Sequence, residues 1–133
     1  MKKLYTSAKL ILLGSVVSFS QLLNAQQVID FESANLAIDT YWDGSDLSGY
    51  YEENGVHFEN NYSSAFDYWA GGFAVSSVRN DTTAGWENPF GNITGTGNNS
   101  NTFGVLYDSD YYINFNTTVS FSSIKVTNNT YSY

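Results

Sequence analysis

The chain has 133 residues, with 13 acidic side chains against five basic ones and a formal net charge of −8 at pH 7. Because a chain this acidic repels nucleic-acid phosphates and anionic membranes, we expect neither as a partner. It contains no cysteine, which excludes disulfides, thiol catalysis and Cys-based zinc sites. Aromatic residues make up 17% of the chain, more than disordered chains carry, so we expect a folded core.

The first 25 residues have the features of a secretory signal peptide. Lys2 and Lys3 precede an apolar run over residues 10–19, and Ala25 offers a small residue before an expected cut at Gln26. Charge, apolar run and cleavage site in this order are typical of an export signal. The run is shorter than the ~20 apolar residues that span a bilayer. We therefore predict a secreted or cell-surface protein, which is not a lipoprotein because no cysteine follows the cut.

Export would leave residues 26–133, a length that suits one domain. Of the basic residues only Arg79 and Lys125 remain, so two positive charges face 13 negative ones and the net charge becomes −11. Without disulfides, stability must come from packing or from a bound metal.

Short runs of β-prone residues follow one another between turn-forming residues. Asn54-Gly55 separates residues 50–53 from 56–60, and an Asn-Gly pair in that position predicts a tight β-hairpin. Residues 33–40 are expected to form a connection with a short helical turn, between the first expected strand and the loop over residues 41–50. Residues 79–100 form a long loop rich in Asn, Gly and Thr. The other expected strands are residues 28–32, 73–78, 102–107, 111–115 and 119–128. No helical periodicity interrupts them, which favours an all-β, antiparallel, jelly-roll-like β-sandwich over residues 26–133.

The last expected strand, residues 119–128, is also the longest. Its apolar positions change from odd (Val119, Phe121) to even (Ile124, Val126) across Ser122-Ser123, which predicts a β-bulge. The chain stops soon after this strand. A sandwich needs further strands to cover its edges, so we expect this chain to be the N-terminal portion of a longer domain.

Five short motifs occur in one order along the chain. They are Phe31-Glu32, the run 41–46 with Ser48-Gly49, and the runs 69–76, 80–85 and 126–131. The series resembles the secreted bacterial family named domain of unknown function 4465, over nearly all of residues 26–133. One departure is that Ala70 and an extra glycine interrupt the run that begins at Trp69. The resemblance implies an exported, non-catalytic β-sandwich that binds a ligand, with corrinoids as one candidate class.

The loop over residues 41–50 carries most of the candidate ligand-binding residues. Tyr41, Trp42, Asp43 and Asp46 lie in it, and Trp86 lies in the long loop. Aromatic faces stack on sugar rings or flat apolar ligands, and neighbouring carboxylates bind hydroxyl groups. The alternative is that these aromatic residues belong to the core, which we expect of Trp69. The predicted ligand is a glycan or another small molecule.

The same loop carries the candidate metal site. Asp43, Ser45 and Asp46 place oxygen atoms close together, as calcium requires. The alternative is that the aspartates form Asx turns, as we expect for Asp108 and Asp110. No cofactor other than calcium at Asp43 and Asp46 is expected.

Catalysis is not expected. His57 is the only histidine, and no Gly-x-Ser-x-Gly turn accompanies it. Glu52 and Glu53 are neighbours on an expected strand, so they point to opposite faces. The remaining hypotheses are a ligand-binding module, a structural or adhesive surface protein, and, with least support, a secreted hydrolase.

Overall fold

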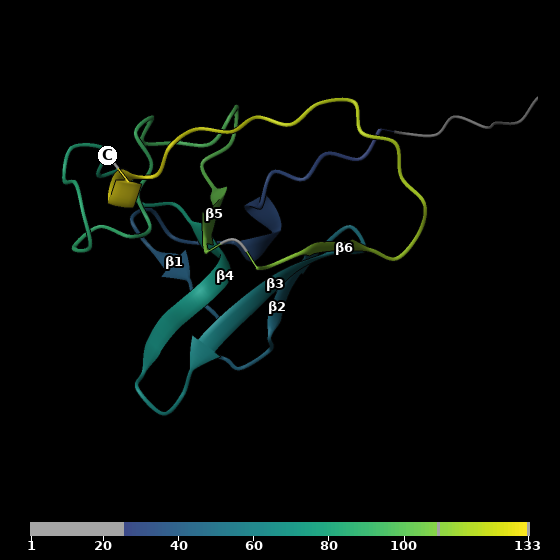
Figure 1. The fold of residues 1–133 in the computed structure, drawn as a ribbon. Helices are drawn as coiled ribbons and strands as arrows, with labels where there is room; N and C mark the ends of the chain where they lie inside the picture. The colour runs from purple at the N-terminus through teal and green to yellow at the C-terminus, as the bar shows by residue number, and fades with distance from the viewer. Residues whose placement is uncertain (1–25, 109, 133) are drawn as a thin grey trace, which may run out of the picture.

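The computed structural model describes residues 26–108 and 110–132, which form a curled antiparallel β-sheet (Figure 1). The predicted signal peptide lies outside the described residues. The strands are β1 (Tyr41–Trp42), β2 (Tyr50–Glu53), β3 (Val56–Ser63), β4 (Tyr68–Ser76), β5 (Phe103–Tyr107) and β6 (Ile113–Phe115). Two 3-10 helices accompany them, η1 (Glu32–Ala34) and η2 (Thr130–Ser132). The prediction of an all-β antiparallel fold is confirmed, and its completion as a sandwich stays a prediction.

The sheet has the order β1-β4-β3-β2, while β5 also pairs with β4 and β6 with β3. The β2–β3 hairpin turns at Asn54 and Gly55, whose φ angles are 52° and 76°. Positive φ at both positions is what an Asn-Gly hairpin turn needs, so this prediction is confirmed. As expected, Val56 and Phe58 are buried, and His57 on the other face is half-buried.

Strand β4 is the centre of the fold, and both of its faces are covered. On the inner face, Phe73 meets Phe58 edge-on, with ring centroids 5.3 Å apart. Phe31 fills the space above them, 5.1 Å from Phe58. A side chain at Gly104 would collide with the Phe31 ring at 2.7 Å, so only glycine lets the ring approach β5.

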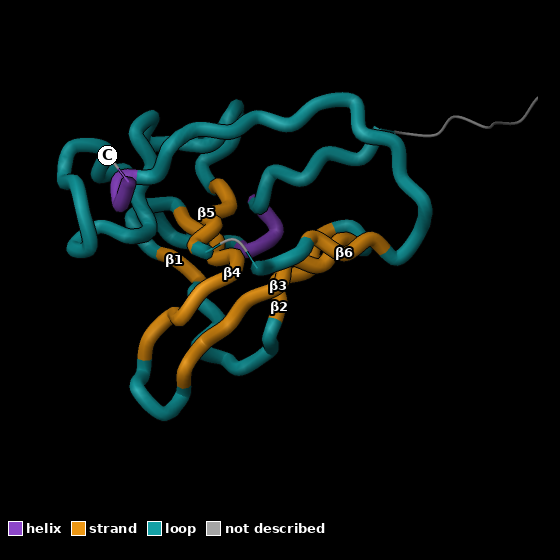
Figure 2. The backbone as a smooth tube through the Cα atoms, viewed as in Figure 1, coloured by secondary structure: helices purple, strands orange, loops and turns teal. Residues whose placement is uncertain are grey.

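The outer face of β4 carries Ala74 and Ser76, which pair with Val105 and Phe103 of β5. A long loop, residues 77–102, lies over this face (Figure 2). Its backbone is held by side chains: Ser76 Oγ donates to the carbonyl of Phe90 at 2.7 Å, and Asn88 Nδ2 donates to the carbonyls of Asn80 and Thr83. Asn and Ser side chains replace strand pairing in this way, so a loop serves as a packed layer.

The predicted strand over residues 28–32 is wrong. Phe31 has a left-handed backbone with φ of 64°, and η1 begins at Glu32. Side chains, and not a neighbouring strand, supply the hydrogen-bond partners for the backbone of this segment. Glu53 accepts the Phe31 N–H at 2.9 Å, and Ser100 and Thr102 donate to the Asp30 carbonyl.

The predicted strand over residues 119–128, with its bulge at Ser122-Ser123, is also wrong. Within the described chain, residues 117–127, which we call the strap, form no strand (Figure 1). The phase change is the physical reason, because one flat strand cannot turn all four apolar side chains to one face. The register irregularity of the sheet lies between Asn61 and Tyr62 of β3 instead.

Within residues 26–108 and 110–132, no helix has the length and apolar character to cross a bilayer.

Candidate functional site

Five aromatic rings form a continuous row on the outer side of β4. We call them the aromatic column: Tyr41 of β1, Phe90 of the long loop, Trp69 of β4, Tyr107 of β5 and Tyr131 of η2. The rings of Tyr41 and Phe90 are stacked with centroids 3.8 Å apart, and Phe90 stacks on Trp69 at 5.1 Å. Tyr107 and Tyr131 continue the row at 5.8 Å and 5.6 Å with tilted rings.

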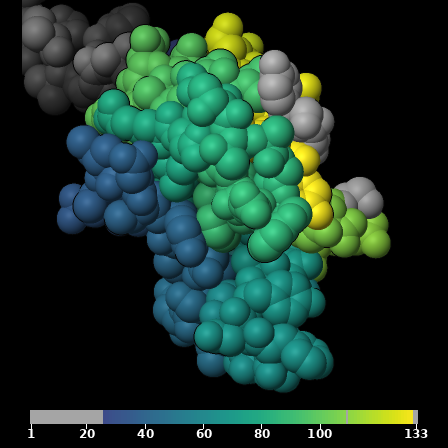
Figure 3. All heavy atoms as spheres, turned by 90° about the vertical axis from the view of Figure 1, so that its left-hand side faces the viewer, coloured from purple at the N-terminus to yellow at the C-terminus, as the bar shows by residue number. Residues whose placement is uncertain are grey.

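The column joins segments that are far apart in the sequence. Figure 3 shows the long loop, in teal and green, lying between the blue N-terminal segment and the yellow C-terminal one. Thr130, which is fully buried, fixes the C-terminal end by donating from Oγ1 to the Asn88 carbonyl at 2.6 Å. The Thr130 N–H donates to Gly91, and its carbonyl accepts from Gly85. Tyr131 is therefore held against the loop that carries Phe90.

Three rings of the column are accessible to a ligand. Tyr41 is 48% exposed, Tyr107 42% and Tyr131 41%, whereas Trp69 and Phe90 are half-buried between them. Partly exposed aromatic rings in contact make an apolar surface with polar hydroxyl tips. Such a surface suits ligands that combine flat apolar faces with hydroxyl or amide groups.

Two carboxylates and Tyr41, the first ring of the column, surround Tyr62 of β3 closely enough to influence it electrostatically. Tyr62 donates its hydroxyl to Asp67 Oδ1 at 2.6 Å, and this bond is the main cause that raises the pKa of Tyr62 to about 12. Asp43 and Tyr41 lie near enough to add to the effect electrostatically. Carboxylates accept hydrogen bonds and attract positive charge.

The predicted loop over residues 41–50 is anchored by one buried side chain, Asn60 of β3. Its Nδ2 donates to the carbonyls of Asp43 at 2.9 Å and Phe73 at 2.8 Å, and its N–H donates to Gly49. Gly44 packs directly on it, because a Cβ at this position would lie 1.8 Å from Asn60 Oδ1. The loop is thus fixed to the sheet.

Trp42 and Asp46 form a pair on the other side of β1 from Tyr41. Trp42 Nε1 donates to Asp46 Oδ2 at 3.0 Å, and Ser48 donates to Oδ1 from both its N–H and its hydroxyl. The bond from Trp42 is the largest cause that lowers the pKa of Asp46. The Trp42 ring lies 5.8 Å from Tyr51 and is half-buried, so it does not join the aromatic column.

Asp43 and Asp46 both form Asx turns, in which Asp43 Oδ1 accepts the Ser45 N–H at 3.1 Å and Asp46 accepts that of Ser48. Among residues 26–108 and 110–132, no three His, Cys, Asp or Glu side chains group closely enough to hold a metal ion. A calcium ion here would need carbonyl oxygens or water to complete its usual 6–8 ligands, roughly. Calcium binding by Asp43 and Asp46 stays a prediction.

Trp86 is the most exposed tryptophan, at 75%. It lies in the long loop that also carries Phe90. Of the five predicted ligand-binding residues, only Tyr41 belongs to the aromatic column.

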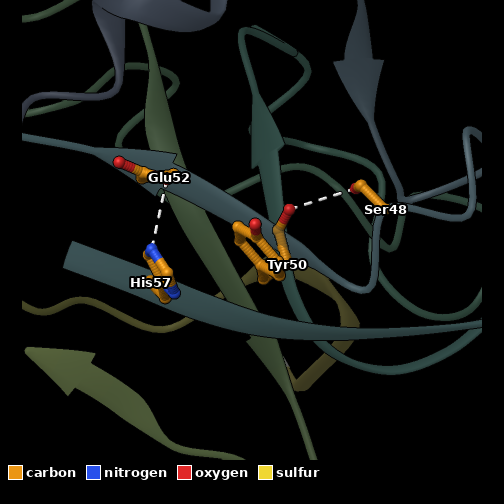
Figure 4. Close-up of polar contacts among 4 residues, drawn as sticks. All are labelled: Ser48, Tyr50, Glu52 and His57. Atoms are coloured by element: carbon orange, nitrogen blue, oxygen red, sulfur yellow. Dashed lines mark hydrogen bonds and ion pairs between the residues drawn. The ribbon is translucent and has the colours of Figure 1, made fainter. Parts of the chain in front are cut away.

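His57 lies in a small polar cluster on the exposed face of the β2–β3 hairpin (Figure 4). Its Nε2 is 3.1 Å from Glu52 Oε2, and its ring stacks on Tyr50 at 4.4 Å. Ser48, also drawn in Figure 4, shares its one hydroxyl proton between Asp46 Oδ1 at 2.8 Å and the backbone carbonyl of Tyr50 at 3.1 Å, and it does not face the imidazole. The cluster therefore lacks the nucleophile–base contact of a Ser-His-Asp triad.

Glu53, next to Glu52, points inward and is only 7% exposed. Burial is the main cause that raises the pKa of its carboxyl group, and the nearby Asp30 carboxylate adds to the increase. Its Oε2 accepts from the Phe31 N–H at 2.9 Å and from the Tyr51 hydroxyl at 3.5 Å. Glu53 thus ties η1 to β2, and the opposite directions expected for the two glutamates are confirmed.

Sequence reasoning missed Phe90, Tyr107 and Tyr131 as site residues. A signal existed for Tyr107, since it shares the alternation of Phe103 and Val105 and so lies on the same face of β5. Phe90 and Tyr131 lie in irregular segments that follow no alternation.

Comparison of the chain with protein-family models, with curated proteins and with solved structures finds no match. The resemblance to domain of unknown function 4465 therefore rests on the ordered motifs alone.

Proposed function

We propose that the chain is an exported, non-catalytic β-sandwich protein that binds a glycan or corrinoid-type ligand on the aromatic column. The single observation that supports this site is the unbroken row of five rings, three of which are 41–48% exposed. Three strands, the long loop and the C-terminal segment all contribute to it, so the surface is fixed before a ligand arrives. Fixed binding surfaces lose little conformational entropy on binding.

Charge supports a neutral or cationic ligand over an anionic one. Residues 26–133 carry a net charge of −11. Asp43 follows Tyr41 by two residues, and Asp43, Asp67 and Tyr41 all act electrostatically on Tyr62. The protein would repel an anionic ligand at long range, whereas it would not repel a neutral sugar.

Isothermal titration calorimetry with neutral glycans and with cobalamin tests the proposal. We expect one of these classes to bind, and Tyr107→Ala to weaken binding by about tenfold, which corresponds to ~1.4 kcal/mol. Phe66→Ala is the matched control, because Phe66 is 79% exposed in the β3–β4 turn and its ring faces Tyr68, which is not part of the column. Absence of binding to both classes, or an equal loss in both variants, would refute the site.

The alternative is a structural or adhesive surface protein in which the loops serve only as turns. The contact of Trp42 with Asp46 and Tyr51 favours a structural role for this residue. Under this alternative, Trp42→Ala and Trp86→Ala change the melting temperature but no binding constant.

Calcium is a separate proposal for Asp43 and Asp46. Calorimetric titration with calcium after treatment with a chelator should give a heat that Asp43→Asn abolishes. Equal heats from both proteins would eliminate this site.

A further inference from the structure

The segment over residues 28–35 lies against the aromatic side chains of the inner face, and we call it the N-terminal cover. Its Phe31 ring is 5.1 Å from Phe58 and 5.8 Å from Tyr51, measured between ring centroids. The cover has no strand partner among the described residues, so side-chain hydrogen bonds connect its backbone to the rest of the fold. Opening of the cover would separate the Phe31 ring from Phe58 and admit water to the core.

Some of the hydrogen bonds that hold the cover do not depend on pH between acid and neutral solution. The Asp30 carbonyl accepts from Ser100 Oγ at 2.8 Å and from Thr102 Oγ1 at 2.9 Å. The Val28 carbonyl accepts from Asn54 Nδ2 at 3.2 Å. Hydroxyl and amide groups do not titrate in this range. Any pH dependence of the cover must therefore come from the carboxyl groups that bind it.

Glu53 of β2 binds the cover most strongly when it carries its proton. It is 7% exposed, its Oε2 accepts the Phe31 N–H at 2.9 Å, and in the described chain no basic side chain forms an ion pair with it. The titratable groups that face it are the Asp30 carboxylate and the Tyr51 hydroxyl. Burial raises the pKa of Glu53, the Phe31 N–H opposes this increase without cancelling it, and the charge of Asp30 adds to it. A protonated Glu53 can donate to Asp30, whereas an ionised one repels it.

Glu32 of η1 binds the long loop most strongly when it has lost its proton. Its Oε1 accepts from the Ser100 hydroxyl at 2.8 Å and from the Asn101 N–H. These hydrogen bonds, the one from Ser100 first, lower the pKa of Glu32 because they stabilise the ionised carboxylate. The positive charge of this loop segment is that of Arg79, whose Nη2 donates to Asn101 Oδ1 at 3.1 Å. The cover is therefore held by two carboxyl groups that need opposite protonation states.

The ordinary pKa of both carboxyl groups is 4.5, and the fold shifts the two values in opposite directions. The stabilisation from Glu53 is complete below 4.5 and is lost as the pH rises through its raised folded pKa. The stabilisation from Glu32 is complete above 4.5 and is lost as the pH falls through its lowered folded pKa. Burial raises the pKa of Tyr51 above its ordinary value of 10.0, so its hydroxyl stays protonated throughout. His57 and Glu52 contact each other on the other face of the hairpin.

We propose that the N-terminal cover is controlled by pH: it is closed while Glu53 is neutral and Glu32 is ionised, and it opens more often when either condition is lost. On the alkaline side, the buried charge of Glu53 and its repulsion of Asp30 favour separation of the cover from β2. On the acid side, neutral Glu32 binds Ser100 less strongly. In both cases opening admits water to Phe58. The inference is independent of the aromatic column and of its ligand.

Amide hydrogen exchange of the full chain, followed by mass spectrometry between about pH 3 and pH 7, tests the proposal. The protein is kept dilute, because protonated carboxyl groups remove the charge that keeps it soluble. After correction for the exchange of an unstructured peptide of the same sequence, the protection of residues 28–35 should be greatest near pH 4.5. It should fall on both sides, by up to about tenfold for each unit of pKa shift, while β4 keeps its protection. A flat profile, or an equal fall in β4, would overturn the proposal.

Two neutral variants separate the contributions of the carboxyl groups. Glu53→Gln should abolish the fall in protection on the alkaline side, and Glu32→Gln the fall on the acid side, while each keeps the other. Misfolding would not produce this pattern, because each variant retains half of the natural profile. Glu52→Gln is the matched control, since it makes the same change on the other face of β2, and it should leave the natural profile intact. If Glu53→Gln loses protection on the alkaline side as the natural chain does, or if Glu52→Gln has the same effect as Glu53→Gln, the cover is not controlled by Glu53.

Discussion

Asn60 is the side chain whose removal should reveal most about how the fold holds the loop over residues 43–49. It is 8% exposed, and its amide nitrogen donates to two backbone carbonyls, those of Asp43 and Phe73. Asn60→Ala removes both donors and leaves two acceptors inside the protein. A buried polar group without a partner costs about 1–3 kcal/mol, so we expect a loss of roughly 2–4 kcal/mol of unfolding free energy. That is a large part of the ~5–15 kcal/mol of a typical domain.

Asn60→Asp separates hydrogen bonding from packing. The variant keeps the shape of the side chain, but a carboxylate oxygen replaces the donor and faces the same two carbonyls. A carboxylate has no proton to donate at neutral pH, and burying its charge unpaired costs more than burying an amide. We therefore expect Asn60→Asp to be less stable than Asn60→Ala at neutral pH, and the difference to shrink as the pH falls.

Urea unfolding followed by tryptophan fluorescence and circular dichroism measures these differences. Asn61→Ala is the matched control, because this neighbour is exposed and its amide contacts only the Tyr111 hydroxyl, at 2.9 Å. We expect that control to lose about 0.5 kcal/mol. If Asn60→Ala costs no more than Asn61→Ala, or if Asp is tolerated as well as Ala, the amide does not anchor the loop.

Three further substitutions test the packing of the fold. The pKa of Glu53 is raised in the folded protein, so its contribution to stability is complete below the ordinary value of 4.5 and is lost as the pH rises through the folded pKa. Glu53→Gln should therefore be more stable than the natural chain at neutral pH. Thermal melts should show that this advantage vanishes in acid. Gly44 has a φ of 86°, and the Cβ of Gly44→Ala would lie 1.8 Å from Asn60 Oδ1. We therefore expect this variant to lose at least about 2 kcal/mol of unfolding free energy, measured by urea unfolding. An unchanged midpoint would contradict the close packing. Thr130→Val keeps the side-chain volume but removes the 2.6 Å hydrogen bond to the Asn88 carbonyl. It should lower the unfolding free energy by about 1–2 kcal/mol and speed amide hydrogen exchange in the long loop. Unchanged exchange there would contradict the role of Thr130.

Local signals in the sequence predicted the elements that neighbouring residues control. Asn54-Gly55 predicted its hairpin because the turn needs positive φ at two adjacent positions, and both have it. Alternation separated Glu53, which is buried, from Glu52 on the other face. Of the five rings in the aromatic column, local reasoning named only Tyr41 as a ligand-binding residue. A row of rings that come from five separate segments leaves no local pattern in the sequence.

The sequence by itself determined the antiparallel all-β character of this protein, its tight hairpin, its strong negative charge and the outward or inward direction of most strand residues. These depend on backbone preference and on two-residue periodicity, which adjacent residues decide. Only the tertiary structure decided that residues 28–32 and 119–128 are not strands. A strand needs a partner. Distant side chains take that role at Asp30 and Phe31, whereas the phase change at Ser122-Ser123 leaves the strap without a partner strand among residues 26–108 and 110–132.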